Sequence, residues 1–149
     1  MRLKEKVAII TGGASGFGRG IVERFINEGA KVVIADINLE LANQVADGLG
    51  DNCIAVEVNV SNALDIEKMI DETIKNFLKI DILVQNAAIG MKPQALVDTS
   101  IELYDKLFNT NVKSIFLGSK NIIPVFSMRQ VFLGIVPDFI LCPIVFHPT

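Results

Sequence analysis

The sequence predicts an α/β fold built on a doubly wound parallel sheet, with helices in layers on both faces of the sheet. Short apolar segments, of the type buried on both faces of a parallel sheet, alternate four times with amphipathic helical patterns. No tight-turn motif joins one apolar segment to the next, which favours right-handed β-α-β connections. The chain has 149 residues, of which 50% are hydrophobic and 21% charged, and this is typical of one globular domain.

Four apolar segments are the predicted strands. They cover residues 7–10, 31–36, 53–58 and 81–84. The first is apolar at every position, which indicates a strand covered on both faces. The second ends in an acidic residue, Asp36, at the tip of the strand.

Cap residues mark the ends of the first three predicted helices. Gly29 ends the first helix, because glycine readily adopts the left-handed conformation that closes many helices. Asn38 caps the second helix and Gly50 closes it. The third helix begins at Ser61 or Asn62, and these two alternatives stay open. Its inward-facing apolar positions are Ile66, Met69, Ile70, Ile74 and Phe77.

A longer helical pattern follows the fourth strand. Thr99 and Glu102 have the spacing of a capping box, in which each side chain satisfies the other's free backbone N–H. Pro124 marks the end of the pattern. Its apolar positions are Leu103, Leu107, Ile115 and Ile122.

The glycine-rich stretch between the first strand and the first helix predicts a phosphate site. Gly12, Gly16 and Gly18 have the spacing T-G-x-x-x-G-x-G, one residue longer than the general dinucleotide fingerprint. Bare backbone there lets the N–H groups at the helix start approach a diphosphate, and the helix dipole favours its negative charge. The alternative is an ordinary structural turn, which also uses glycine.

Asp36 favours the nucleotide interpretation and indicates which cofactor is bound. It follows Gly18 by 18 residues, close to the roughly 20 expected of the acid that binds the adenosine ribose hydroxyls. A carboxylate accepts hydrogen bonds from two hydroxyls and repels a phosphate in the same place. Ser15 lies in the turn and Ile37 follows the acid, so no neighbouring arginine is available for a 2′-phosphate. The sequence therefore predicts NAD rather than NADP.

The chain resembles the amino-terminal half of the short-chain dehydrogenase/reductase family, in its classical, oxoacyl-reductase-like branch. The resemblance covers about residues 5–125 and implies a Rossmann-type, three-layer αβα domain, here truncated after the fourth or fifth strand. The residues that carry it are Thr11, Gly12, Gly16, Gly18, Asp36, Asn59, Val60, the run 85–88 (Gln-Asn-Ala-Ala) and Asn111. The cofactor-binding residues that we expect are Gly12, Ser15, Gly16, Phe17, Gly18, Asp36, Asn59, Val60, Asn86 and Ala88.

The resemblance also implies individual roles. Asn59, where the family usually has Asp, would accept a hydrogen bond from the adenine amino group, and Val60 would pack beside the ring; a strand end and helix cap is the alternative. Asn86 would brace the sheet, and the backbone near Ala88 would line the nicotinamide ribose. Gln85 and Ala88 depart from the family's Asn and Gly, the second acceptably if the backbone there is not left-handed.

Asn111 lies in the apolar stripe of the long helical pattern, four residues from Leu107 and from Ile115. A buried amide without partners costs about 1–3 kcal/mol, so we expect a hydrogen bond bridging helix and sheet. In the family the matching Asn holds a water that relays protons to a catalytic lysine, which makes Asn111 the one candidate catalytic residue.

The proton-transfer residues of the family are not recognisable in this sequence. The family uses a serine and a Tyr-x-x-x-Lys pattern, in which a cation lowers the phenol pKa. The one tyrosine, Tyr104, precedes Asn111 and is followed four residues later by Phe108. After position 120 the only charged residues are Arg129 and Asp138. We therefore divide the chain into a dinucleotide-binding domain, 1–125, and an atypical apolar tail, 126–149, with one candidate strand at 131–136.

These patterns leave three functional hypotheses. The first is an NAD(H)-dependent oxidoreductase that interconverts ketones and secondary alcohols in a full-length parent, with this chain inactive or nearly so. The others are a non-catalytic NAD-binding or partner-binding fragment and an unstable truncated product, whose uncovered apolar surface would favour association into a homo-oligomer.

Composition excludes several other classes of protein. The net charge of −3 gives no support for nucleic acid or an anionic membrane as partner. Pro137, Asp138 and Pro143 interrupt the apolar tail, so no membrane span is predicted. The lone His147 and the two cysteines have no metal-ligand spacing, so no metal site is expected. No secretory signal is visible, and we expect a cytoplasmic protein.

Overall fold

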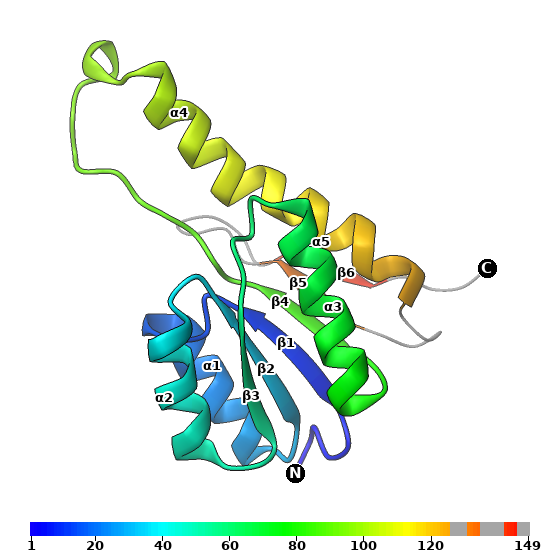
Figure 1. Cartoon of the computed structure of the whole chain (residues 1–149). Coiled ribbons are helices and arrows are strands. Elements are labelled where there is room, and N and C mark those ends of the chain that lie inside the picture. The colour runs from blue at the N-terminus through cyan, green and yellow to red at the C-terminus, as the bar shows by residue number, and fades with distance from the viewer. Residues whose placement is uncertain (126–130, 135–141, 146–149) are drawn as a thin grey trace.

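The computed structural model describes residues 1–125, 131–134 and 142–145 and contains one six-stranded sheet (Figure 1). The strands are β1 (Val7–Thr11), β2 (Lys31–Asp36), β3 (Cys53–Glu57), β4 (Ile82–Gln85), β5 (Val131–Gly134) and β6 (Cys142–Val145). Their order in the sheet is β3-β2-β1-β4-β5-β6. β1 to β5 are parallel, which confirms the four predicted parallel strands, and β6 is antiparallel to β5.

The two strands in the apolar tail differ in how well the sequence predicts them. β5 lies within the candidate strand 131–136, whose last two residues are outside the described residues. The sequence predicts no strand at β6, because proline cannot donate a ladder hydrogen bond and Pro143 lies inside it. β6 is the last strand of the sheet, and an edge strand tolerates a proline. The division of the chain at residue 125 stays a prediction.

Helices cover both faces of the sheet. Figure 1 shows α1 (Gly16–Asn27) and α2 (Leu39–Leu49) on one face, and α3 (Ala63–Phe77) and α5 (Ser114–Ile122) on the other. Successive strand residues point to opposite faces, so Ile9 packs in the core under α3 and α5, whereas Ile10 packs in the core under α1 and α2. Both side chains are fully buried. The sheet is therefore covered on both faces, as a continuously apolar β1 predicts.

Most of the predicted helix caps are confirmed. The side chain of Asn38 accepts a hydrogen bond from the Leu41 N–H at 3.0 Å. Of the two alternatives for α3, Asn62 is the cap, and its side chain accepts from the Leu64 N–H at 3.0 Å. Gly50 caps the end of α2 with a φ of 83°.

The cap predicted for the long helical pattern is wrong by one residue. Ser100, not Thr99, caps α4 (Ile101–Phe108), and its hydroxyl accepts a hydrogen bond from the Leu103 N–H at 3.2 Å. The Thr99 hydroxyl donates instead to the Ala95 carbonyl at 3.4 Å. Two adjacent hydroxyl residues can both serve as a cap, and the position of Glu102 favoured the wrong one.

The long helix is not a regular α-helix throughout. A π-helical turn, Asn109–Lys113, separates α4 from α5 and shifts the helical phase between them. Figure 1 shows α4 extending away from the sheet. The exposed apolar side chains of this helix recur at helical spacing: Ile101, Tyr104, Phe108, Val112 and Phe116. Contiguous exposed apolar surface of this kind is typical of protein–protein contacts, whereas isolated apolar surface residues are not. Association into an oligomer stays a prediction.

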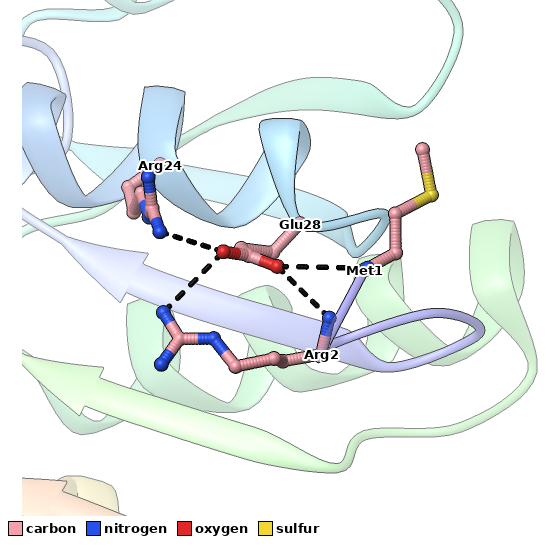
Figure 2. A network of polar contacts seen from close by, with 4 residues as sticks. All are labelled: Met1, Arg2, Arg24 and Glu28. Carbon is pink, nitrogen blue, oxygen red and sulfur yellow. Dashed lines mark hydrogen bonds and ion pairs between the residues drawn. The ribbon is translucent and has the colours of Figure 1, made fainter.

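A cluster of polar contacts ties the first residues of the chain to the end of α1 (Figure 2). The Glu28 carboxylate accepts hydrogen bonds from the Arg2 backbone N–H at 2.9 Å and from the Arg24 guanidinium at 2.7 Å. It also lies 4.0 Å from the amino-terminal ammonium of Met1. The Arg2 backbone hydrogen bond, assisted by the charges of Arg2 and Arg24, lowers the pKa of Glu28. This cluster fixes the segment that leads into β1.

We predict that Asp81 makes stability dependent on pH. Its carboxylate, 8% exposed, accepts from the Val7 N–H at 2.9 Å and pairs with Lys79 at 2.9 Å and Lys6 at 3.2 Å. Burial acts to raise the pKa of Asp81, but the Val7 hydrogen bond and the two ammonium groups outweigh burial and lower it. A carboxyl whose pKa is lower in the folded state stabilises the fold above its ordinary pKa, about 3.9, and loses this effect as the pH falls through its lowered value.

The variant Asp81→Ala should therefore lose about 2–3 kcal/mol of unfolding free energy at pH 7, because the buried Val7 N–H loses its acceptor. The difference in unfolding free energy between the variant and the parent chain should shrink below the ordinary carboxyl pKa of about 3.9. Urea unfolding at pH 7 and at about pH 3 measures both quantities. Asp71→Ala, at an exposed position on α3, is the control. An equal loss at both pH values would contradict this account of Asp81.

Candidate functional site

A cavity of about 970 Å³ lies at the carboxyl ends of the strands. The chain builds β1, β2 and β3 in one direction across the sheet and then crosses to β4 on the other side of β1. Parallel α/β sheets bind ligands in the crevice at such a reversal of strand order. The lining residues come from the segments after β1 to β4, from α1, α4 and the π turn: Gly12, Ser15, Phe17, Gly18, Ile21, Ala35, Asp36, Ile37, Val58, Asn59, Val60, Ser61, Asn86, Ala87, Ala88, Ile89, Lys106, Asn109 and Thr110.

The glycine-rich turn forms one wall of the cavity and needs glycine for two different reasons. Gly12 and Gly16 have φ values of 65° and 53°, a conformation that other residues rarely adopt. Gly18 lies at the start of α1 against the turn, where an added Cβ would be 2.7 Å from the Gly12 carbonyl carbon and 2.6 Å from the Asn86 side-chain nitrogen. Gly18 therefore permits the close approach of α1 to β1. Gly16, alone of the three, does not line the cavity.

The Asp36 carboxylate lies beside the glycine turn, as the sequence predicts. One of its oxygens accepts a hydrogen bond from the Ala14 N–H at 3.0 Å, and the other accepts from the Asn38 N–H at 3.0 Å. These two bonds fix the orientation of the carboxylate at the cavity wall. Each carboxylate oxygen has two lone pairs, so each can accept a further hydrogen bond from a ligand.

Asn86 and Thr11 hold the segment after β4 against the glycine turn. The Asn86 side-chain amide donates to the carbonyls of Thr11 at 3.1 Å and Gly12 at 3.2 Å. In return, the Thr11 hydroxyl accepts from the backbone N–H groups of Asn86 and Ala87, both at 3.0 Å. Asn86 thus joins β4 to β1. Among the described residues only Glu5 and Leu78 combine a side chain with a positive φ, so Ala88 replaces a glycine without strain.

Asn59 and Val60 line the cavity from the end of β3. The Asn59 side-chain oxygen accepts from the Ser61 N–H at 3.0 Å, and the Asn59 N–H donates to Asp65 at 2.9 Å. These are the contacts of the strand-end and helix-cap alternative. They do not exclude a role toward a ligand, because the amide oxygen keeps a second lone pair. The Val60 side chain is buried at 7% exposure.

Asn111 lies in the π turn and does not line the cavity itself. Its side-chain oxygen accepts from the Ile89 N–H at 2.9 Å, and its side-chain nitrogen donates to the Ile89 carbonyl at 2.9 Å. Ile89 does line the cavity. The predicted bridge from helix to sheet therefore exists, with the segment after β4 rather than a strand as the partner. Asn111 therefore holds a residue of the cavity wall without lining the cavity itself.

Sequence reasoning missed the contribution of the long helix to the cavity. Lys106, Asn109 and Thr110 line it, and the Thr110 hydroxyl lies 3.3 Å from the Ser61 hydroxyl. The only sequence signal for these lining residues is that Asn109 and Thr110 stand next to Asn111. No clear sequence pattern predicts the path of α4 or the π turn. Tyr104 does not line the cavity, and its ring stacks on that of Phe108 with the ring centroids 4.3 Å apart.

Metal-ligand clusters and membrane-spanning helices are both absent from the described residues, 1–125 and the strands β5 and β6. No group of three or more His, Cys, Asp or Glu side chains there could hold a metal ion. Burial raises the pKa of the Cys53 thiol to about 11. No helix in the same residues is both long and apolar enough to cross a membrane.

Comparison with known proteins gives consistent matches. The family model described as short chain dehydrogenase matches residues 6–132. A sorbitol dehydrogenase of Cereibacter sphaeroides is 42% identical over 75% of this chain and 43% of its own length. The 3beta-hydroxysteroid dehydrogenase 2 of Eggerthella lenta is 35% identical over 85% of this chain and 50% of its own length.

A solved structure shows the same likeness. The 3-ketoacyl-(acyl-carrier-protein) reductase from Brucella melitensis, complexed with NADH, is 41% identical, with a TM-score of 0.82 over 83% of this chain and 51% of that one. The chain thus spans about half the length of the proteins that it matches.

Proposed function

The chain belongs to the short-chain dehydrogenase family, and from this membership we propose that it binds NAD(H) in the cavity as the cofactor-holding part of an oxidoreductase. One observation carries the proposal. The Asp36 carboxylate is fixed beside the glycine turn, at the strand-order reversal, on a cavity of about 970 Å³. That volume is at the upper end of the roughly 300–1,000 Å³ of ligand pockets, which suits a large ligand such as a dinucleotide. The solved reductase with the same fold holds NADH.

The residues present fit such a cofactor. The start of α1 faces the cavity with backbone N–H groups that no earlier helical turn satisfies, which suits a diphosphate. Ser15 begins α1 without a side-chain cap hydrogen bond, so its hydroxyl is available to the same diphosphate. Asp36 would accept from the adenosine ribose hydroxyls. Gly16, which does not line the cavity, would act by shaping the turn rather than by contact.

The order of the strands supports one direction for the bound cofactor. β2 and β3 lie on one side of β1, and β4 lies on the other. If Asp36 binds the adenosine ribose, the adenine ring lies on the side of Asn59 and Val60. The nicotinamide half then falls on the side of Asn86 and Ala88, with Phe17 on α1 near the diphosphate. We assign the cofactor-binding roles of these residues on this basis.

The charge at Asp36 favours NAD over NADP. A 2′-phosphate would stand next to a carboxylate that already has a fixed orientation, and like charges at that distance repel. Lys106 is the cation that lines the cavity among the described residues, and it lies on α4 rather than beside Asp36 in the chain. We therefore propose weaker binding of NADPH than of NADH.

In the reaction, the bound nicotinamide would supply or accept a hydride at a carbon bearing oxygen. The residues of this chain hold and orient it: the glycine turn and Asp36 on one half, and the braced segment after β4 on the other. Asn111 keeps that segment in place through Ile89, and a role in a proton relay would also need the serine, tyrosine and lysine of the family. Because no Tyr-x-x-x-Lys pattern occurs in the 149 residues, we propose negligible turnover by this chain alone.

A fluorescence titration of the folded 149-residue chain with NADH tests the proposal. Saturable binding is expected, with weaker binding of NADPH and no consumption of NADH when simple ketones are added. Joining the chain to a carboxyl-terminal half with Ser, Tyr and Lys should give NAD-dependent oxidation of secondary alcohols. A sample with a cooperative unfolding transition that fails to bind NADH would overturn the proposal.

A further inference from the structure

Gln85, at the end of β4, has an unusual position between the sheet and α5. Its side chain is buried, with 6% of the residue exposed. Its side-chain nitrogen donates to the Ile115 carbonyl at 3.3 Å and lies 3.5 Å from the Ser119 hydroxyl. The residue therefore joins the last position of β4 to the first turn of α5, at a residue that is 30 positions away in the chain.

Gly118 makes room for this side chain. A Cβ built at Gly118 would overlap the Gln85 side-chain oxygen and lie 3.0 Å from its amide carbon. It would also be 3.6 Å from Leu83. α5 approaches β4 closely at this point because Gly118 has no side chain, and the long Gln85 amide fills the space that is left. The two residues are complementary in volume.

The helix that contacts Gln85 also holds the far end of the adjoining cavity wall. Gln85 directly precedes the segment 86–89, all four residues of which line the cavity. The far end of that segment, Ile89, is held by Asn111, one helical turn before Ile115. One continuous helix therefore holds the segment at its start through Gln85 and at its end through Asn111.

We propose that Gln85 and Gly118 together position the wall that receives the nicotinamide half of the cofactor, so that Gln85 is a positioning residue for that half alone. The inference rests on the proposed NAD(H) binding. The adenosine half would contact Asp36, the last residue of β2, and Asn59, which follows β3, and the hydrogen bonds of both run to residues outside α5. Loss of the Gln85 contact should therefore act on one half of the cofactor.

The variant Gln85→Asn tests the inference, because its amide is one methylene too short to reach Ile115. NADH binding should weaken about tenfold, equivalent to about 1.4 kcal/mol, and the fluorescence of bound NADH should change as the nicotinamide becomes less ordered. The affinity for ADP, which carries only the adenosine half and the diphosphate, should change less than about twofold, a difference of under about 0.4 kcal/mol. A merely structural role of Gln85 would lower both affinities together.

Gly118→Ala reaches the same contact from the other side, since its Cβ would displace the Gln85 amide. The two changes break one interaction, so the double variant should bind NADH about tenfold, not a hundredfold, more weakly than the parent. If Gly118→Ala does not fold, Gln85→Asn alone carries the test. The control is Thr73→Val, which removes a buried hydroxyl bonded to Met69 on α3. Neither residue lines the cavity, so the ratio of the two affinities should stay unchanged.

The outcomes separate the two proposals. If the parent chain binds neither NADH nor ADP, the proposed function is wrong and the positioning role with it. If the parent binds both ligands and Gln85→Asn weakens both equally, or neither, the positioning role of Gln85 is wrong while the proposed function stands.

Discussion

Replacement of Gly18 by alanine should abolish NADH binding and lower the unfolding free energy by about 3 kcal/mol, the upper range for overpacking. The new Cβ would be 2.7 Å from the Gly12 carbonyl carbon, a backbone atom that cannot rotate away as a side chain can. Gly12 is itself packed on its other side, where its own added Cβ would be 2.9 Å from the Ala87 Cα. The turn therefore has no direction in which to yield, and α1 must move away from β1.

Gly20→Ala is a matched control for this prediction. Gly20 lies on the same helix, and a Cβ added there would meet nothing within 4 Å. It should raise the unfolding free energy by up to about 1 kcal/mol, the helix preference of alanine over glycine, and leave NADH affinity unchanged. Urea unfolding and an NADH titration of both variants make the comparison. Parent-like stability of Gly18→Ala would show that the close approach of α1 to β1 is not required.

Local patterns were sufficient to predict the parts of the site that depend on single elements. The apolar runs predict the limits of β1 to β4 to within one residue at each end. Asp36 was placed correctly because β1 and β2 are parallel neighbours, so the end of β2 must lie beside the turn after β1. The cap at Asn38 followed from side-chain chemistry alone. These are contacts between residues whose geometry the backbone of one or two elements determines.

Contacts that depend on how a helix rotates against the sheet could not be predicted. The π turn at 109–113 shifts the helical phase, so Thr110 reaches Ser61, which no periodic pattern indicates. The sequence shows that Gln85 departs from the family's Asn. It does not show that Gly118 makes room for the longer side chain, because that depends on how α5 packs on β4. β6 was missed because proline argues against a strand except at an edge, and only the sheet order shows an edge there.

Replacement of Asp36 by alanine should weaken NADH binding about a hundredfold, equivalent to about 2.7 kcal/mol, since hydrogen bonds to a carboxylate are worth about 1.5–3 kcal/mol each. Part of this loss has a structural origin, because the Ala14 N–H in the glycine turn loses its acceptor. Asp36→Asn separates the two causes: its amide oxygen can still accept from the Ala14 N–H, whereas the exposed Asn38 N–H turns to water, and the charge is gone. It should weaken NADH binding by about tenfold, or about 1.4 kcal/mol.

The ratio of NADH to NADPH affinity distinguishes a direct contact with the cofactor from a damaged turn. A distorted glycine turn lowers both affinities equally, because both cofactors place the same diphosphate there. Removal of the carboxylate charge also relieves its repulsion of a 2′-phosphate, so NADPH binding should fall less than NADH binding, or improve. Asp47→Asn, an exposed carboxylate on α2, changes net charge equally without reaching the cavity and should leave the ratio unchanged. An unaltered ratio of NADH to NADPH affinity in Asp36→Asn would mean that Asp36 supports the turn and does not contact the ribose.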